Sequence, residues 1–490
     1  MSCASAASDE SANSGQYEER GSDSTQVTTE EFRRYGHDTV DWMADYLENI
    51  REYPVLPDTQ PGALVDRLPA AAPERGESMD VILEDFEQSI VPEMTHWNHP
   101  RFFAYFANSG SHPGILGEML TAALNGNGMV WKSGPAITEL EQVTLGWLRQ
   151  WLGLPEEFFG IIHDTASVAT MHAIAAAREM AEPESRRKGN SGRLVMYISE
   201  HANFSVEKAG MTLGLGQDNI RQIPSDEAFR MRVDLLREAM DADRRAGKKP
   251  FCVVPTVGTT STSSIDPVPA IADVAEEFGA WLHVDAAYGG AAAILPELNS
   301  ILAGAERAHS VVVNPHKWLL TPMDLSALYT REPEILRRAF SLVPEYVKTA
   351  EDPRAINYME YGVQLGRRFR ALKLWFVMRH YGREGVCAII RSHIEYAQKL
   401  ASLIRSDPDF EIAAPTPFSL VCFRYRGSDD DNRALLEGIN ASGKAFLSHT
   451  VLNGRFVLRL AIGNIATRWE DLEEVWELVR QSAKKTAAAP

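Results

Sequence analysis

A lysine shortly after a short apolar stretch is the residue of this chain that most clearly suggests chemistry. Lys317 follows the run Ser310–Val313, whose β-branched residues predict a strand buried on both faces. An ammonium group at the end of such a strand loses hydration, so its pKa falls and the amine can attack carbonyl groups and form Schiff bases. The alternative is a lysine whose side chain extends from the strand end into solvent.

An aspartate stands at the end of a second apolar stretch. Asp285 closes the run Trp281–Asp285, which also predicts a buried strand. An enzyme that uses pyridoxal phosphate needs a lysine for the aldehyde and an acid that keeps the pyridine nitrogen protonated. Asp285 and Lys317 are 32 residues apart, on neighbouring βα units, so both could extend from strand ends into one crevice. Helix N-capping is the alternative role of the aspartate.

Two motifs around these residues resemble those of a known family. HVDAAY at residues 283–288 and NPHKW at residues 314–318 resemble the group II pyridoxal-phosphate-dependent decarboxylases, and most closely the aromatic L-amino acid decarboxylases. The resemblance extends from about Glu30 to about Val479. It implies an α/β fold of the type I pyridoxal phosphate enzymes, with a large domain around a mostly parallel seven-stranded sheet, a smaller C-terminal α/β domain and an N-terminal helical segment. It also implies pyridoxal 5′-phosphate bound through Lys317.

A turn of small residues before an alanine-rich stretch predicts a phosphate site. Thr165, Ala166 and Ser167 open the helical run 168–180, and N–H groups at a helix N-terminus bind anions. Ordinary capping by Ser or Thr is the alternative. The resemblance implies that Ala166 and Ser167 hold the cofactor phosphate. The family has small residues where this chain has Asp164, and repulsion predicts that Asp164 points away from the phosphate or caps the helix.

The resemblance assigns further residues around the cofactor. His201 corresponds to the planar residue that stacks on one face of the pyridine ring, and Ala287 would cover the other face. Thr260 corresponds to a cofactor-contacting threonine, and Asn314 and His316 correspond to positions around the phosphate and the Schiff base. A structural histidine after a predicted strand is the alternative for His201.

The implied reaction is decarboxylation, in which the bond held perpendicular to the pyridine ring breaks and Cα is then protonated in a site closed to water. The polar segment 344–354 predicts a mobile loop, and Tyr346 corresponds to the loop tyrosine of the family. Relatives with phenylalanine there tend toward aldehyde formation, so Tyr346 favours release of the amine. An exposed tyrosine without a role is the alternative. The predicted catalytic residues are Lys317, Tyr346, His201 and Asp285.

An aromatic stretch predicts one wall of the substrate pocket. Trp97, Tyr105 and Phe106 correspond to wall residues of the family, although aromatic residues at this density more often form core. Met129 corresponds to a residue that the partner subunit contributes, and Gly366 leaves room where relatives that prefer phenols carry serine. This set favours a large aromatic substrate side chain and slightly favours indole.

Four other functions remain open at this point. An aromatic aldehyde synthase would couple decarboxylation to oxidative deamination. Decarboxylation of another amino acid, such as glutamate, is a minor option that Lys132 near the predicted pocket mouth keeps open. An aminotransferase could use Arg459 for the substrate carboxylate, but a firmly held carboxylate is not readily lost. A catalytically silent binding protein would retain the whole set of site residues without using it.

The composition of the chain argues against several classes of protein. A formal net charge of −18 argues against a nucleic-acid or anionic-membrane surface, because both need clustered Lys and Arg. Cys3, Cys252, Cys387 and Cys422 lack the spacing of metal ligands or of a disulfide framework, so we expect reduced thiols in a cytoplasmic protein and no metal site. We expect neither a membrane span nor a secretion signal.

The N-terminal part predicts a helix with an apolar face. Thr28 and Glu31 have the spacing of a capping box, and apolar residues follow at helical spacing from Phe32 to Ile50. In the similar decarboxylases this helix packs on a second subunit, so we expect a homodimer with the active site at the interface. Packing on the same chain is the alternative.

Short apolar runs alternate with helical patterns through the middle of the chain, which predicts a parallel sheet covered on both faces. We expect a disordered tail (1–26), a helical and wrapping segment that includes a proline-rich linker at 54–73 (27–112), a large cofactor domain (113–374), a small domain (375–484) and a tail (485–490). The predicted strands are 193–199, 251–257, 281–285, 310–314, 327–330, 419–425 and 456–462, and the predicted helices include 234–246, 269–278 and 470–484.

Overall fold

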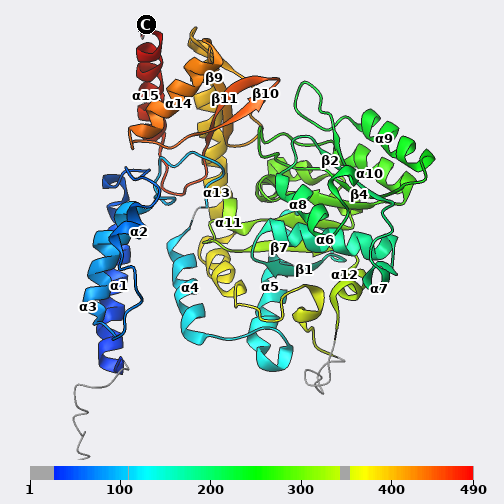
Figure 1. Cartoon of the computed structure of the whole chain (residues 1–490), viewed down its shortest axis with the longest axis horizontal. Helices are drawn as coiled ribbons and strands as arrows, with labels where there is room; N and C mark the ends of the chain where they lie inside the picture. Colours follow the sequence, from blue (N-terminus) through cyan, green and yellow to red (C-terminus); the bar gives the residue numbers. More distant parts are fainter. Residues whose placement is uncertain (1–26, 109, 343–353, 489–490) are drawn as a thin grey trace, which may run out of the picture. The chain divides into compact units, whose positions relative to one another are not determined.

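The computed structural model describes residues 27–108, 110–342 and 354–488 (Figure 1). Contacts divide the chain into two units, one with residues 27–50 and 59–94 and the other with residues 51–58 and everything from residue 95 onward. The expected disordered tail and Tyr346 lie outside the described residues. Within these ranges, no helix combines the length and the apolar character that crossing a membrane requires.

The first unit begins with the helix that the sequence predicts. In α1 (Thr29–Glu48), the Thr28 hydroxyl accepts a hydrogen bond from Glu31 N at 3.2 Å, and the Glu31 carboxylate accepts one from Thr28 N at 2.8 Å. The capping box is therefore confirmed. None of the residues of α1 is buried.

Helix α1 pairs with the other helices of its unit. The Tyr35 hydroxyl donates a hydrogen bond to Asp80 of α3 (Met79–Asp85) at 2.7 Å, and the Trp42 ring lies 4.9 Å from the Phe86 ring. Short helices occupy part of the predicted linker and the end of the unit: α2 (Ala63–Arg67), the π-helix η2 (Phe86–Ile90) and the 3-10 segment η3 (Val91–Glu93).

A seven-stranded sheet forms the centre of the second unit. Its order is β1-β7-β6-β5-β4-β2-β3, and only β7 runs antiparallel to its neighbours. The predicted mostly parallel sheet is confirmed, although β1, β3 and the direction of β7 were not predicted. The strands are β1 (Phe159–His163), β2 (Leu194–Ser199), β3 (Ile220–Ile223), β4 (Lys249–Val254), β5 (Trp281–Asp285), β6 (Ser310–Val313) and β7 (Ser326–Thr330).

Both faces of this sheet are buried. Along β6, Val311 and Val313 pack into one hydrophobic cluster and Val312 packs into another, as the alternation of side chains in a strand requires. Helices α6, α8 and α12 contribute to the cluster of Val312, whereas α5, α9, α10 and α13 contribute to the other. The helices are α4 (His112–Leu124), α5 (Pro135–Leu152), α6 (Ala166–Ala181), α7 (Ser185–Lys188), α8 (Phe204–Thr212), α9 (Val233–Arg245), α10 (Val268–Phe278), α11 (Pro315–Trp318), α12 (Pro333–Phe340) and α13 (Ala371–Ser406).

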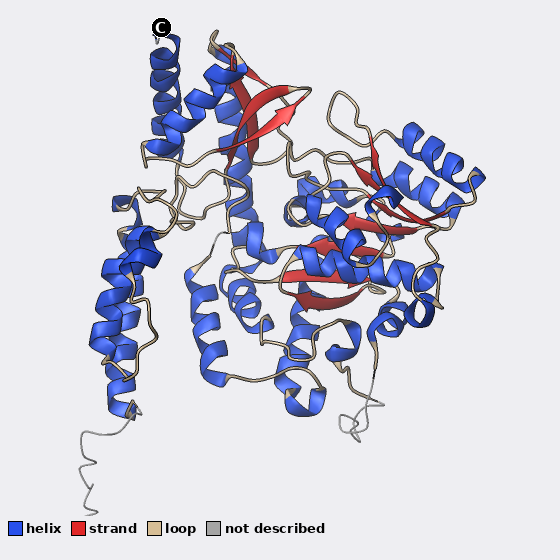
Figure 2. Ribbon diagram, in the orientation of Figure 1, coloured by secondary structure: helices blue, strands red, loops and turns tan. Residues whose placement is uncertain are grey.

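A smaller antiparallel sheet follows in the same unit, with the order β10-β11-β9-β8. Figure 2 shows its strands as a group separate from the large sheet. Helix α13 leads to it and is interrupted at Gly382, whose φ of 62° is easily adopted only by glycine. The elements are β8 (Phe410–Ile412), β9 (Leu420–Tyr425), α14 (Asp429–Ala441), β10 (Ser448–Leu452), β11 (Arg455–Ala461) and α15 (Trp469–Ala488).

Short 3-10 segments connect these elements. They are η1 (Ile50–Glu52), η4 (Trp131–Ser133), η5 (Gln217–Asn219), η6 (Gly289–Ile294), η7 (Pro296–Leu302), η8 (Ala305–Arg307) and η10 (Tyr358–Tyr361).

Candidate active site

Lys317 lies on the short helix α11, one turn beyond the end of β6. Its ammonium nitrogen is 5.7 Å from the centroid of the Phe106 ring. Burial lowers the pKa of Lys317, and the nearby Asp285 carboxylate opposes that shift. A larger fraction of the amine is therefore neutral than at an exposed lysine, which is the form that attacks carbonyl groups.

Asp285 ends β5, which pairs in parallel with β6. The side chain is 5% exposed and accepts a hydrogen bond from Ala287 N at 3.0 Å. Burial raises the pKa of Asp285, whereas Lys317 lowers it. Asn314 N donates to Ala287 O at 3.1 Å, so the segments after the two strands are held together. The structure thus brings Asp285 and Lys317 to one edge of the sheet.

The residues beside Lys317 are fixed by hydrogen bonds. The Asn314 side-chain oxygen accepts from the Ser326 hydroxyl at 2.6 Å, and His316 Nδ1 accepts from Leu325 N at 2.9 Å. Burial, followed by repulsion from Lys317, lowers the pKa of His316 to about 4. His316 is therefore neutral at pH 7, and its ring orientation is set by the backbone.

The predicted phosphate site lies at the N-terminus of α6. The N-cap residue Thr165 forms no side-chain capping bond, so the first N–H groups of this helix, which include those of Ala166 and Ser167, are not capped by it. The Asp164 carboxylate accepts from Thr165 N at 2.6 Å, which is the N–H of the N-cap residue itself, so this bond does not cap the first N–H groups of the helix. His163, at the end of β1, pairs with Ser326, which places the start of α6 at the same sheet edge as Asn314.

His201 follows β2 and is partly buried. Burial lowers the pKa of His201 against the opposing effect of Glu200, so the ring is neutral at pH 7. Close to it along the chain, Asn203 donates a hydrogen bond to the Thr260 hydroxyl at 3.0 Å. The loops that carry the predicted stacking residue and the predicted cofactor-contacting threonine are therefore in direct contact.

The residues of the predicted substrate wall belong to two groups of aromatic rings. The Trp97 and Tyr105 rings are stacked at 5.9 Å, and the Phe106 ring is stacked on Tyr288 at 3.7 Å. Phe446, which the sequence did not point to, lies edge-on to Tyr105 at 5.8 Å. It comes from the segment before β10, and no motif marks it. Of the three residues predicted for the wall, Phe106 is the one whose ring lies beside Lys317.

Arg459 is buried on the same side of the site, with 3% of its surface exposed. Its guanidinium donates hydrogen bonds to Thr260 O at 2.7 Å, to Ser261 O at 3.1 Å and to the Ser448 hydroxyl at 2.7 Å. Most of its N–H groups are thus used within the protein. This arrangement does not favour the aminotransferase alternative, in which Arg459 would bind the substrate carboxylate.

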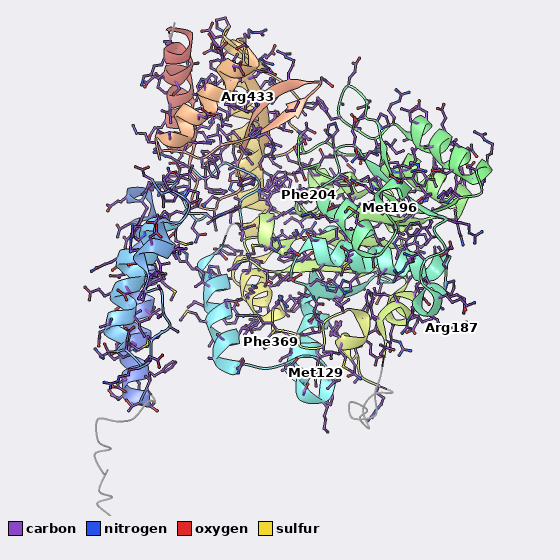
Figure 3. All side chains as sticks on the ribbon, in the orientation of Figure 1. Met129, Arg187, Met196, Phe204, Phe369 and Arg433 are labelled. Atoms are coloured by element: carbon purple, nitrogen blue, oxygen red, sulfur yellow. The ribbon has the colours of Figure 1, made fainter. Side chains whose placement is uncertain are left out.

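Met129 and Gly366 lie together but not beside Lys317. Gly128 N donates to Arg367 O at 2.9 Å, which joins the two segments. Figure 3 shows Met129 near the lower end of the second unit, away from α11 in Figure 1. Lys132 belongs to η4 in the same region. Within one chain these three residues therefore do not line the pocket at Lys317.

These residues fit pyridoxal phosphate. The site combines a buried lysine of lowered pKa, a buried carboxyl group on the neighbouring strand and an uncapped helix N-terminus at the same sheet edge. Ala287 is small, is 7% exposed and is hydrogen-bonded to the segment of Lys317, so a flat ring could approach it closely. In the described ranges, no group of three or more His, Cys, Asp or Glu side chains is placed to hold a metal ion.

Comparison with known proteins agrees with this chemistry. The pyridoxal-dependent decarboxylase conserved domain matches residues 61–426 of the chain. A phenylacetaldehyde synthase of Arabidopsis thaliana is 40% identical over 474 residues, which are 93% of this chain and 96% of the relative. An aromatic-L-amino-acid decarboxylase of Bos taurus is 42% identical over 474 residues, which are 93% of this chain and 97% of the relative.

Among solved structures, the chain is similar to Oryza sativa TDC with PLP and tryptamine. The TM-score is 0.92 at 39% sequence identity, and the similarity covers 94% of this chain and 99% of that chain. The fold and the cofactor that the motifs implied are thereby confirmed.

Proposed function

The chain belongs to the family of pyridoxal-dependent decarboxylases, and from this premise we propose that it converts an aromatic L-amino acid into the arylalkylamine and CO₂. The observation that carries the proposal is the placement of Asp285 at the end of β5 and of Lys317 just after the neighbouring parallel strand β6, each with a pKa shifted by burial. Titratable side chains of opposite charge that lie close together and have shifted pKa values are characteristic of catalytic sites.

Each residue of the site has a task in this proposal. The neutral amine of Lys317 would bind the aldehyde, and the Asp285 carboxylate would hold a proton at the pyridine nitrogen. The N–H groups at the start of α6 would bind the phosphate, and His201 would lie against one face of the ring. When bound, pyridoxal phosphate accepts the electrons that the departing carboxylate leaves at Cα.

Protonation of Cα decides the product. We assign this step to the Tyr346 hydroxyl, on the basis of the family motif in the sequence, because the residue lies outside the described ranges. The aromatic side chains of Trp97, Tyr105 and Phe106 suit a large apolar substrate side chain. The similar Oryza sativa structure contains tryptamine, which supports an indole substrate.

A product assay tests the proposal. The purified protein with pyridoxal phosphate is offered tryptophan, tyrosine, phenylalanine, DOPA and glutamate separately, and amine, aldehyde and peroxide are quantified. We expect amine from at least one aromatic substrate, and no amine from Lys317→Ala. Lys248→Ala is the matched control and should keep full activity. Lys248 precedes β4, at the edge of the sheet opposite to the strand ends that lead to Asp285 and Lys317. Full turnover by Lys317→Ala would refute the mechanism.

A second function, aromatic aldehyde synthesis, is favoured by the similarity to the Arabidopsis phenylacetaldehyde synthase. In that reaction the amino acid, O₂ and water give the aldehyde, CO₂, ammonia and hydrogen peroxide, with O₂ as the oxidant. Tyr346 favours the amine instead. Aldehyde and peroxide in equal amounts would establish this second function.

We further propose a homodimer. Helix α4 exposes four apolar side chains at helical spacing, and Phe32 of α1 is 70% exposed. A second copy would cover these side chains and would bring Met129 and Gly366 to the partner's pocket. Sedimentation should show a dimer that Leu120→Glu weakens and that Val451→Glu, on an exposed strand position, does not. The exposed side chains of α4 are Leu116, Met119, Leu120 and Leu124.

Localisation in the cytoplasm also remains a proposal. The three cysteines that the structure describes are free and buried, which is compatible with a reducing compartment. Cell fractionation tests it directly.

A further inference from the structure

We infer that Phe229 is a positioning residue that holds the His201 ring in the plane in which it contacts the cofactor. The inference rests on the proposed function, because His201 has a catalytic task only in a pyridoxal phosphate site. It assigns a role to a residue that no motif marks. The observations that carry it are the backbone at Phe229, the hydrogen bonds around it and the surroundings of His201.

The backbone at Phe229 is in a conformation that bulky residues rarely adopt. Its φ is 61°, in the left-handed region, and its side chain is only 4% exposed. A phenylalanine retained in this conformation must be stabilised by its surroundings, and such residues concentrate at functional sites. A glycine would adopt this backbone conformation more easily, so the contacts of the buried Phe229 side chain must offset the strain.

Hydrogen bonds hold the turn around Phe229 from both sides. Phe229 N donates to Asp226 O at 2.9 Å, and Asp226 N donates to Arg230 O at 2.8 Å. The Asp226 carboxylate accepts from Ala228 N at 2.9 Å and from Arg230 N at 3.0 Å. Beyond the turn, Met231 N donates to the buried carboxyl group of Asp266 at 2.7 Å. The Phe229 ring is therefore presented from a fixed turn.

The same framework supports the loop of Thr260. Asp266 also accepts from Thr256 N at 2.8 Å, and the Ser264 hydroxyl donates to Ala228 O at 2.8 Å. The Ser264 hydroxyl lies 2.7 Å from the hydroxyl of Thr262, which in turn lies 3.0 Å from that of Thr259. The turn of Phe229 and the segment 259–264 are thus joined by buried hydrogen bonds.

The His201 ring has few polar contacts among the described residues. Among the described residues, no hydrogen bond is made to its ring nitrogens, and the Glu200 carboxylate is 3.7 Å from Nε2. Burial keeps the ring neutral, so Glu200 exerts little attraction on it. The Phe229 ring lies 5.4 Å from the His201 ring at an interplanar angle of 77°, a favourable edge-to-face contact. Phe229 is thereby the aromatic neighbour that restricts rotation of His201.

Four variants test this role against simple loss of packing. Phe229→Leu keeps an apolar side chain and removes the ring. Phe423→Leu, in the buried strand β9, is the matched control for a lost core phenylalanine. His201→Gln and the double variant with Phe229→Leu form a double-mutant cycle. Apoprotein of each variant is titrated with pyridoxal phosphate by absorbance, visible circular dichroism of the bound cofactor is recorded, and thermal unfolding confirms folding.

We expect Phe229→Leu to weaken pyridoxal phosphate binding about 2- to 13-fold, the range of an edge-to-face ring contact, and to reduce the visible dichroism. In the His201→Gln background the same substitution should have no further effect on binding. Phe423→Leu should lower the unfolding temperature without changing affinity. If Phe229→Leu does not fold, Phe229→Met, which keeps apolar volume without a ring, carries the same expectation.

Equal affinities of Phe229→Leu and the control, or additive effects in the double variant, would overturn the inference. That outcome is distinct from failure of the proposed function. If the unmodified protein binds pyridoxal phosphate and releases amine while the cycle is additive, the positioning role alone is wrong. If the unmodified protein releases neither amine nor aldehyde, the proposed function itself is wrong.

Discussion

Replacing Asp285 with asparagine separates cofactor chemistry from folding. The amide has the shape of the carboxyl group, and its oxygen can still accept the hydrogen bond from Ala287 N, which is 3.0 Å long. The change that remains is the loss of charge in a side chain that is 5% exposed. The variant therefore tests whether the charge of Asp285 has a function.

The expected fall in kcat/KM follows from the energy of one hydrogen bond to a charged group. A hydrogen bond to a charged group contributes about 1.5–3 kcal/mol, and each 1.36 kcal/mol is tenfold in rate, so kcat/KM should fall about 10- to 150-fold. Stability should change in the other direction. Burial raises the pKa of Asp285 in the folded state, so this group stabilises the fold at low pH and that contribution is lost as the pH rises through its folded pKa. At neutral pH the Asp285→Asn apoprotein should unfold at the same temperature or a higher one.

The assay measures kcat/KM with the preferred aromatic substrate, the affinity for pyridoxal phosphate and the unfolding temperature of the apoprotein. Asp243→Asn is the matched control, because Asp243 is a buried carboxylate of α9 that accepts from the Tyr197 hydroxyl at 2.9 Å and pairs with Arg221. The control should lose stability and keep its activity. Unchanged kcat/KM and cofactor affinity in Asp285→Asn would refute the role given to this carboxylate.

Three further predictions address the other parts of the site. Tyr346→Phe should shift the product from amine toward aldehyde with matching peroxide, measured by chromatography and a peroxide assay; a purely amine product would remove the proton-donor role of Tyr346. Ser167→Asp should weaken pyridoxal phosphate binding at least about tenfold by repulsion, while the apoprotein keeps its unfolding temperature because a carboxylate suits a helix N-terminus; unchanged affinity would place the phosphate elsewhere. Because burial lowers the pKa of His201, the acidic loss of kcat/KM that depends on this ring should lie below pH 6.5, the ordinary histidine value, and a pH profile of His201→Gln should lack it.

Much of the large sheet could be predicted because buried parallel strands have a strong sequence pattern. The run Trp281–Asp285 is the observed β5, and the predicted strand 310–314 exceeds β6 by one residue. The capping box at Thr28 was equally clear. These features depend on side chains that are adjacent in the sequence, so a local pattern is sufficient to predict them.

The missed strands lack such a pattern. β3 (Ile220–Ile223) has four residues, two of them polar, and β1 (Phe159–His163) contains a glycine. The antiparallel direction of β7 depends on the path of the chain between strands and has no local signal. Predicted β4 was misplaced by two to three residues, since the observed strand ends before Pro255.

The motif residues of the candidate site could be proposed from the sequence, whereas the residues that pack against them could not. Lys317, Asp285 and His201 stand at the ends of apolar strands, where polar residues are conspicuous. Phe229 has no such signal, because a bulky residue is a poor predictor of a left-handed turn and its partner is 28 residues away in the sequence. Phe446 likewise contacts Tyr105 across more than 300 residues of chain.

The shifted pKa values explain why the two buried groups belong together. Burial alone drives Lys317 and Asp285 toward their neutral forms, and each partly restores the charge of the other. Pyridoxal phosphate fits both groups. Its aldehyde would react with the neutral amine of Lys317, and its basic ring nitrogen would take up a proton at Asp285 and give this buried carboxylate a cationic partner.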